Sequence, residues 1–187
     1  MILASQSPRR KALLSSAGIA FEVDVSQADE PVWDGVQSPE EYTRSLALLK
    51  AREVSSRHVG EVVLGADTVV ALDGVIYGKP KDWEDAWRML RRFSGREHHV
   101  FTGVALVKDG AVLHSWTADT AVRFKVLDDA VIRRYFELVN VLDKAGAYGI
   151  QEHGEMIVDE IRGSYSNVVG LPVEEVKAVL FDKTHEQ

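Results

Sequence analysis

The stretch ILASQSPRRKALL, which begins at Ile2, brings hydroxyl and guanidinium groups to a point where a strand pattern changes into a helix pattern. Free backbone N–H groups and the helix dipole favour an anion at a helix N-terminus. Ser5 and Ser7 add hydroxyl donors, and Arg9 and Arg10 add cations suited to phosphate. The stretch is a candidate anion site, although a capped helix with solvated arginines is the simpler interpretation when it is taken alone.

Three later stretches carry further polar groups. LGADTVV places Asp67 after a buried strand, where a carboxylate is costly unless it is paired or binds a metal, so Asp67 is a candidate metal ligand or general base. GKPKD holds Lys79 in a rigid turn, from which it could reach a phosphate. DKAGAYGIQ has glycines that allow a ligand to approach the backbone, and the amide of Gln151 could read a base edge. A turn aspartate, an exposed lysine and a surface loop are the respective alternatives.

Other signals are weaker or absent. The acidic pair Asp29-Glu30 and Lys50 are explained equally well by a solvated face. The six histidines form no zinc pattern, and His98 and His99 should point to opposite faces of a strand. The chain has no Walker A loop, nucleophile elbow or dinucleotide fingerprint. The polar set therefore favours phosphate chemistry with a divalent metal over acyl transfer.

Length and composition limit the class of protein. A chain of 187 residues favours one domain over residues 1–187. Its formal net charge of -7 disfavours a nucleic-acid coat or a basic membrane binder. It has no cysteine, which excludes disulfides and thiolate chemistry and fits a cytosolic protein. No apolar run is long enough for a membrane span, and the N-terminal pattern differs from that of a signal peptide.

Strand-rich and helical patterns alternate along the chain, which predicts an α/β or α+β layer structure. Capping residues mark several helix starts, among them Ser7, Asp82 and the Ser38–Glu41 capping box. The predicted helices span residues 8–17, 38–54, 82–94, 128–140 and 172–182. The predicted strands are 1–5, 21–25, a hairpin in 61–78 that turns at Asp73-Gly74, two strands in 97–127 joined at Asp109-Gly110, and 156–161 inside an irregular stretch, 143–170.

Six motifs occur in order: ILASQSPRRKALL, LGADTVV, GKPKD, LRRFSGREHHVFTGVAL, LDKAGAYGIQ and VVGLP. In these motifs the chain resembles the Maf family of nucleoside triphosphate pyrophosphatases over residues 2 to 181. The resemblance implies an α/β fold similar to that of inosine triphosphate pyrophosphatase: an elongated mixed β-sheet flanked by helices, in two lobes with a central cleft. It also implies hydrolysis of a nucleoside triphosphate to its monophosphate and pyrophosphate, dependent on Mg²⁺ or Mn²⁺.

The resemblance also suggests roles for individual residues. SPRR, Thr68 and Gln151 resemble the dTTP/UTP pyrophosphatase subgroup, and Asp67 looks like the catalytic carboxylate. Arg10, Thr68 and Gln151 look like specificity positions, Ser5, Arg9, Lys50 and Lys79 like phosphate contacts, and Asp67 and Glu30 like metal ligands. The acidic stretch around Glu30 aligns loosely, so Asp29 is the alternative ligand. The chain departs from the family pattern after GIQ, where Glu152 and His153 precede the glycine.

The resemblance further implies a homodimer that removes nucleoside triphosphates from nucleotide pools. The composition and charge add the expectations of a cytoplasmic protein with no stable nucleic-acid binding and no membrane association. Three alternatives remain open. The first is a pyrophosphatase of broader range that accepts modified nucleotides. The others are a non-enzymatic division-control protein, as the older family name suggests, and a sensor that binds nucleotide without turnover.

Overall fold

The computed structural model describes residues 1–181 of the chain. Within them, seven strands form one mixed sheet in the order β2-β1-β3-β5-β6-β7, and β4 pairs with β3. β1 is parallel to β2 and to β3, while the other pairs are antiparallel. The strands are β1 Ile2–Leu3, β2 Glu22–Val23, β3 Val62–Leu72, β4 Val75–Tyr77, β5 Glu97–Lys108, β6 Ala111–Phe124 and β7 Val158–Arg162. The predicted mixed sheet is confirmed.

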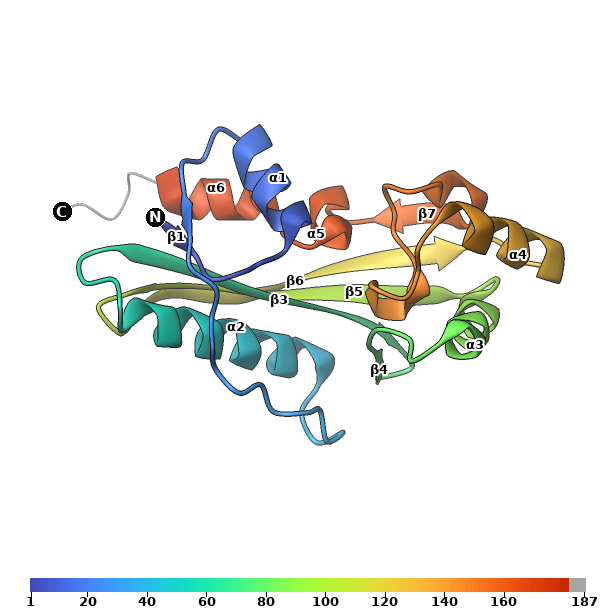
Figure 1. Cartoon of the computed structure of the whole chain (residues 1–187), viewed down its shortest axis with the longest axis horizontal. Helices are drawn as coiled ribbons and strands as arrows, with labels where there is room; N and C mark the ends of the chain where they lie inside the picture. The colour runs from blue at the N-terminus through green and yellow to red at the C-terminus, as the bar shows by residue number, and fades with distance from the viewer. Residues whose placement is uncertain (182–187) are drawn as a thin grey trace.

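Three long neighbouring strands, β3, β5 and β6, give the molecule its elongated shape (Figure 1). Two tight turns occur where the sequence predicted them, one between β3 and β4 and one between β5 and β6. Asp73-Gly74 and Asp109-Gly110 all have positive φ, between 49° and 77°. This conformation matches the right-handed twist of the paired strands and explains why each turn ends in glycine.

The helices are α1 Pro8–Ser16, α2 Pro39–Ser55, α3 Trp83–Phe93, α4 Asp129–Leu138, α5 Tyr165–Val169 and α6 Val173–Phe181, with 3-10 turns η1 Ala145–Ala147 and η2 Gly154–Met156. At one end of the sheet, α1 and α6 lie on one face and α2 on the other (Figure 1). The predicted caps are present, because Ser7, Ser38 and Asp82 each accept a hydrogen bond from a first-turn N–H group. The predicted end of the last helix, Asp182, lies outside the described residues. None of the helices described is both long and apolar enough to cross a membrane.

Three local predictions were wrong. The strand expected at 21–25 is reduced to the two residues of β2, both exposed, because β2 is the sheet edge and pairs with β1 alone. The strand expected at 156–161 starts at Val158, since Met156 closes η2. The helix α5 was not predicted, because its five residues lie in a glycine-rich stretch and are too few to show helical periodicity.

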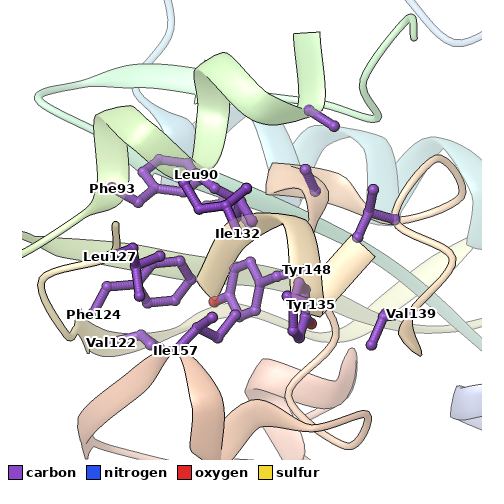
Figure 2. Close-up of a cluster of buried hydrophobic side chains, with 14 of the residues drawn as sticks. Leu90, Phe93, Val122, Phe124, Leu127, Ile132, Tyr135, Val139, Tyr148 and Ile157 are labelled. Carbon is purple, nitrogen blue, oxygen red and sulfur yellow. The ribbon is translucent and has the colours of Figure 1, made fainter. Parts of the chain in front are cut away.

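The hydrophobic core is divided between the two ends of the sheet. At one end, α3, α4 and η1 pack on the strands around Leu90, Phe93, Phe124 and Tyr135 (Figure 2). At the other end, α1 and α6 cover one face and α2 covers the opposite face, each over its own cluster. This division produces the two predicted lobes.

The helix α2 lies unusually close to the sheet. A Cβ atom added at Gly103 of β5 would lie 2.3 Å from the backbone C and O of Thr43, and one at Gly65 of β3 would lie 2.3 Å from Ala47 O. Such distances exclude any side chain at these two positions. The two glycines therefore let α2 approach the middle strands. Lys50, in the C-terminal half of α2, is thereby placed next to β3.

Candidate functional site

A pocket of about 740 Å³ lies between the two lobes. All nine residues predicted for the site line it: Ser5, Arg9, Arg10, Glu30, Lys50, Asp67, Thr68, Lys79 and Gln151. Asp29, the alternative to Glu30, is not among the lining residues. The structure therefore brings together residues that are up to 146 positions apart in the sequence.

Asp67 and Lys50 form the most buried charged pair of the pocket. Lys50 Nζ donates to Asp67 Oδ1 at 2.7 Å and lies 2.9 Å from Glu30 Oε2. The side chains of Lys50 and Asp67 are 13% and 15% exposed, whereas that of Glu30 is 46% exposed. Burial raises the pKa of Asp67, and the positive charge of Lys50 opposes this shift in part. A partly desolvated carboxylate of this kind is suited to accept a proton.

Asp67 lies inside β3, opposite Gly103 of β5, and not after the end of a strand as its sequence suggested. The reason is that β3 pairs with β5 continuously from Val62 to Ala71. The carboxylate is consequently held by a rigid ladder of backbone hydrogen bonds. Its position is fixed more firmly than a turn would allow.

Arg10 connects three segments of the pocket. Its guanidinium donates to Gly170 O at 2.8 Å, to Ser5 Oγ at 3.1 Å and to Thr68 Oγ1 at 2.9 Å. Thr68 in turn bonds to Thr102 Oγ1 at 2.9 Å. Burial lowers the pKa of Arg10, and the negative charge of Asp67 opposes the change. Arg10 and Thr68 thus act as one hydrogen-bonded unit that shapes the pocket.

Two cations face the pocket without protein partners. Among residues 1–181, neither Arg9 nor Lys79 forms an ion pair within 4.0 Å. Arg9 belongs to the first turn of α1, and Lys79 follows β4 in an exposed turn. Both are available to an anionic ligand, in agreement with the predicted phosphate contacts.

The opposite side of the pocket is more apolar and is built around the loop 143–152. Tyr148 and Ile150 of this loop line the pocket together with Val70 and Val100 of the sheet. Gln151 lies at the exposed end of the same loop. An apolar wall with one amide is suited to a nucleobase, which has apolar faces and polar edges.

Sequence reasoning assigned no role to Lys144, Tyr148 or Gly170, although all three line the pocket. The first two lie in DKAGAYGIQ and the third in VVGLP, so the motifs indicated the right segments. Which of their residues would face the ligand depends on η1 and α5, two short elements that have no sequence periodicity.

The carboxylates of the pocket fit a metal ion that is shared with a substrate. Among the described residues there is no group of three or more His, Cys, Asp or Glu side chains that could hold a metal alone. Asp67 and Glu30, however, lie close enough together for one ammonium group to contact both. Mg²⁺ is commonly held by one or two carboxylates and by oxygen atoms of substrate phosphates, so this donor set suits it.

Comparison with known proteins assigns the chain to a family. The model of the family described as Maf-like protein matches residues 1–183. The chain belongs to this family. It is 46% identical over 185 residues to the dTTP/UTP pyrophosphatase of Akkermansia muciniphila, covering 96% of this chain and 94% of that protein. It is 48% identical to the dTTP/UTP pyrophosphatase of Symbiobacterium thermophilum, covering 96% and 92% of the two chains.

Solved structures show more distant similarity. A HAM1 protein from Coxiella burnetii aligns with 97% of this chain and 98% of its own, at 14% identity and a TM-score of 0.47. A nucleoside-triphosphatase, or dITP/XTP pyrophosphatase, from Mycobacterium abscessus aligns with 65% of this chain and 71% of its own, at 21% identity and a TM-score of 0.38.

Proposed function

We propose that this protein hydrolyses dTTP and UTP at the α-phosphate, releasing the nucleoside monophosphate and pyrophosphate. One observation supports the proposal most strongly. A single pocket combines a desolvated carboxylate, two cations without ion-pair partners among the described residues, a partly buried lysine and an apolar wall with one amide. The names of the relatives, which share 44–48% of its residues over nearly the whole chain, agree with this activity. Removal of unwanted nucleotides from cellular pools is the corresponding biological role.

In the proposed reaction, Asp67 accepts a proton from a water molecule that attacks the α-phosphorus. A new bond forms between the water oxygen and phosphorus, and the bond from phosphorus to the bridging oxygen breaks. The bridging oxygen leaves with pyrophosphate. Arg9, through its guanidinium and its backbone N–H at the start of α1, and Lys79 hold the leaving group and offset its charge.

We further propose that Asp67 and Glu30 hold a Mg²⁺ or Mn²⁺ ion together with the triphosphate. Such an ion would neutralise negative charge on the phosphate oxygens and so assist attack. Lys50, which contacts both carboxylates in the present structure, would then be free to turn to a phosphate oxygen. This movement reconciles its observed contacts with the predicted phosphate role.

Base selection is assigned to three residues. Gln151 would hydrogen-bond to the edge of the pyrimidine, while Arg10 and Thr68 fix the shape of the pocket through their mutual hydrogen bond. A site that offers specific hydrogen bonds discriminates strongly against ligands that leave them unmade. This division of roles explains selection for thymine and uracil.

The test is a panel of nucleoside triphosphates at one concentration, with pyrophosphate release measured in Mg²⁺ and in Mn²⁺. We expect dTTP and UTP to be hydrolysed fastest, with no activity in excess chelator. Equal rates with purine and modified nucleotides would favour the enzyme of broader range. Tight nucleotide binding without release of pyrophosphate would favour the sensor instead. A homodimer and a cytoplasmic location remain predictions from the resemblance, and gel filtration of the purified protein tests the first.

A further inference from the structure

Lys144 is a buried charged residue in the wall of the pocket, and the reaction proposed above gives it no role. Its side chain is only 4% exposed. It lies near the start of the loop 143–152, which carries Gln151. Burial of an ammonium group is costly unless its charge and its hydrogen atoms are matched. The groups that contact this ammonium therefore indicate which part of the structure Lys144 stabilises.

Three acceptors surround Lys144 Nζ. They are Asn140 O at 2.6 Å, Asp143 Oδ1 at 2.9 Å and Glu152 Oε1 at 3.1 Å. The contacts with Asn140 O and Asp143 Oδ1 are hydrogen bonds and use two of the three hydrogen atoms of the ammonium, whereas the contact with Glu152 is an ion pair. The charge of Lys144 is thus matched by groups of the protein itself.

The loop closes around the aliphatic part of Lys144. A Cβ atom added at Gly149 would lie 2.7 Å from Lys144 Cε, so the lysine passes directly against this glycine. Glu152 N donates to Gly149 O at 3.1 Å, which closes a tight turn around Ile150 and Gln151. The ion pair from Lys144 to Glu152 then fixes the residue that directly follows Gln151.

Other contacts hold the earlier part of the loop. The Tyr135 hydroxyl bonds to both N and O of Gly149, at 3.1 Å and 3.3 Å. The Tyr148 hydroxyl lies 2.8 Å from His98 Nε2. Tyr135 and Tyr148 lie side by side in the buried cluster (Figure 2). Neither contact extends beyond Gly149. The end of the loop next to Gln151 is held by the backbone hydrogen bond from Glu152 to Gly149 and by the ion pair between Lys144 and Glu152.

We propose that Lys144 is a positioning residue for base recognition: through Glu152, it holds Gln151 in place against the base of the nucleotide. The inference rests on the proposed function, in which Gln151 contacts the pyrimidine. Without the ion pair, the turn around Gln151 becomes mobile in the free protein, and the nucleotide must order it on binding. Loss of the ion pair should therefore weaken nucleotide binding and base selection. It should leave the positions of Asp67 and of the cations of α1 unchanged.

The test is a double-mutant cycle with Lys144→Met, Glu152→Gln and the double variant, measured as KM and kcat for dTTP. Each single variant should raise KM about tenfold, the effect of re-ordering one or two side chains. Each should leave kcat within about threefold of the wild type. Because one ion pair is responsible for both effects, the double variant should be no worse than the worse single variant. Lys177→Met, the same change on an exposed position of α6, should alter neither constant.

Two results would overturn the inference. An unchanged KM in Lys144→Met would show that the ion pair does not serve binding. A large effect of Lys144→Met combined with no effect of Glu152→Gln would show that Lys144 does not act through Glu152.

Hydrogen exchange of the peptide 147–152, measured without nucleotide, gives a readout that does not depend on activity. Exchange should be faster in both single variants than in the wild type, and unchanged exchange would contradict the inference. Glu152→Gln alters a half-exposed side chain, so it keeps the test valid if Lys144→Met fails to fold. Failure of the wild type to hydrolyse dTTP would refute the proposed function instead, and the exchange measurement would still decide whether Lys144 orders the loop.

Discussion

The two halves of the pocket are built in different ways. The catalytic centre of the phosphate-facing half lies on regular elements, because Lys50 comes from α2, Asp67 from β3 and Arg9 from the first turn of α1. The base-facing half is the loop 143–152, which contains one 3-10 turn and is otherwise irregular. Buried polar contacts, such as those of Lys144, replace the regular backbone hydrogen bonds there.

The difference teaches which kind of change each half tolerates. Chemistry on phosphorus requires charges at fixed positions, and a paired strand and a capped helix supply them. Recognition of a base requires a shaped surface, and a loop wrapped around a few buried side chains can supply it. Changes in the first half should therefore reduce turnover, whereas changes in the second should reduce affinity and selectivity.

The largest effect is expected from Asp67→Asn, which removes the proton acceptor but keeps the size of the side chain. We expect kcat for dTTP to fall about 10³-fold, as measured by pyrophosphate release. Asp159→Asn, on the exposed face of β7, is the matched control and should keep full activity. Near-normal turnover of Asp67→Asn would remove Asp67 from its proposed role.

Gly103→Ala should be the most harmful change to the framework of the phosphate-facing half. The added Cβ would lie 2.3 Å from backbone atoms of Thr43, so α2 must move away from the sheet. We expect unfolding in urea to show a loss of about 3 kcal/mol, the upper range for overpacking. At Gly78, no atom lies within 4 Å of an added Cβ, so Gly78→Ala is the control. Equal stabilities of the two variants would disprove the close approach of α2.

His98, which is buried in the core beneath the base-facing half, should make the folding stability of the protein depend on pH. Burial lowers the pKa of His98 from 6.5 to about 3. Between pH 3 and pH 6.5, His98 is therefore protonated in the unfolded chain but neutral in the folded chain. Stability is then lost as pH falls below about 6.5. Between pH 7 and pH 5, protonation of His98 in the unfolded chain should lower the free energy of unfolding by about 2 kcal/mol.

His98→Phe should remove this part of the pH dependence, as measured by urea unfolding at several pH values. His99→Phe, at the neighbouring position on the other face of β5, should retain it. A wild-type slope in His98→Phe would mean that the proton binds elsewhere.

The smallest effect is expected from Gln151→Ala. Loss of one amide that contacts the base should lower kcat/KM for dTTP about tenfold. The rate for a poorly accepted purine nucleotide should change less, since that base does not make the contact. Gln37→Ala, outside the pocket, serves as the control. A uniform loss across all nucleotides would show that Gln151 supports the phosphate-facing half.

The sequence predicted the regular parts of the molecule well, for reasons that are local. The Ser38–Glu41 capping box and the Asp73-Gly74 turn depend on residues close together in the chain. The same is true of the cap that Ser7 provides at the start of α1. His98 and His99 do point to opposite faces, because His98 is fully buried whereas the side chain of His99 is 42% exposed.

Other features could not be predicted, because they depend on contacts between distant residues. The three partners of Arg10 include Gly170, which is 160 positions away. The close packing of α2 on Gly103 is not visible in either segment alone. The environment of Lys144 depends on how the loop turns back at Glu152, which no periodic pattern indicates.

Hydrolysis of dTTP by the wild-type protein in ¹⁸O-labelled water tests the central claim most directly. Attack of water on the α-phosphorus, next to Asp67, places the label in dTMP and leaves pyrophosphate unlabelled. Mass spectrometry of the two products distinguishes this outcome from attack elsewhere. Label in pyrophosphate, or formation of dTDP and phosphate, would contradict the proposed reaction.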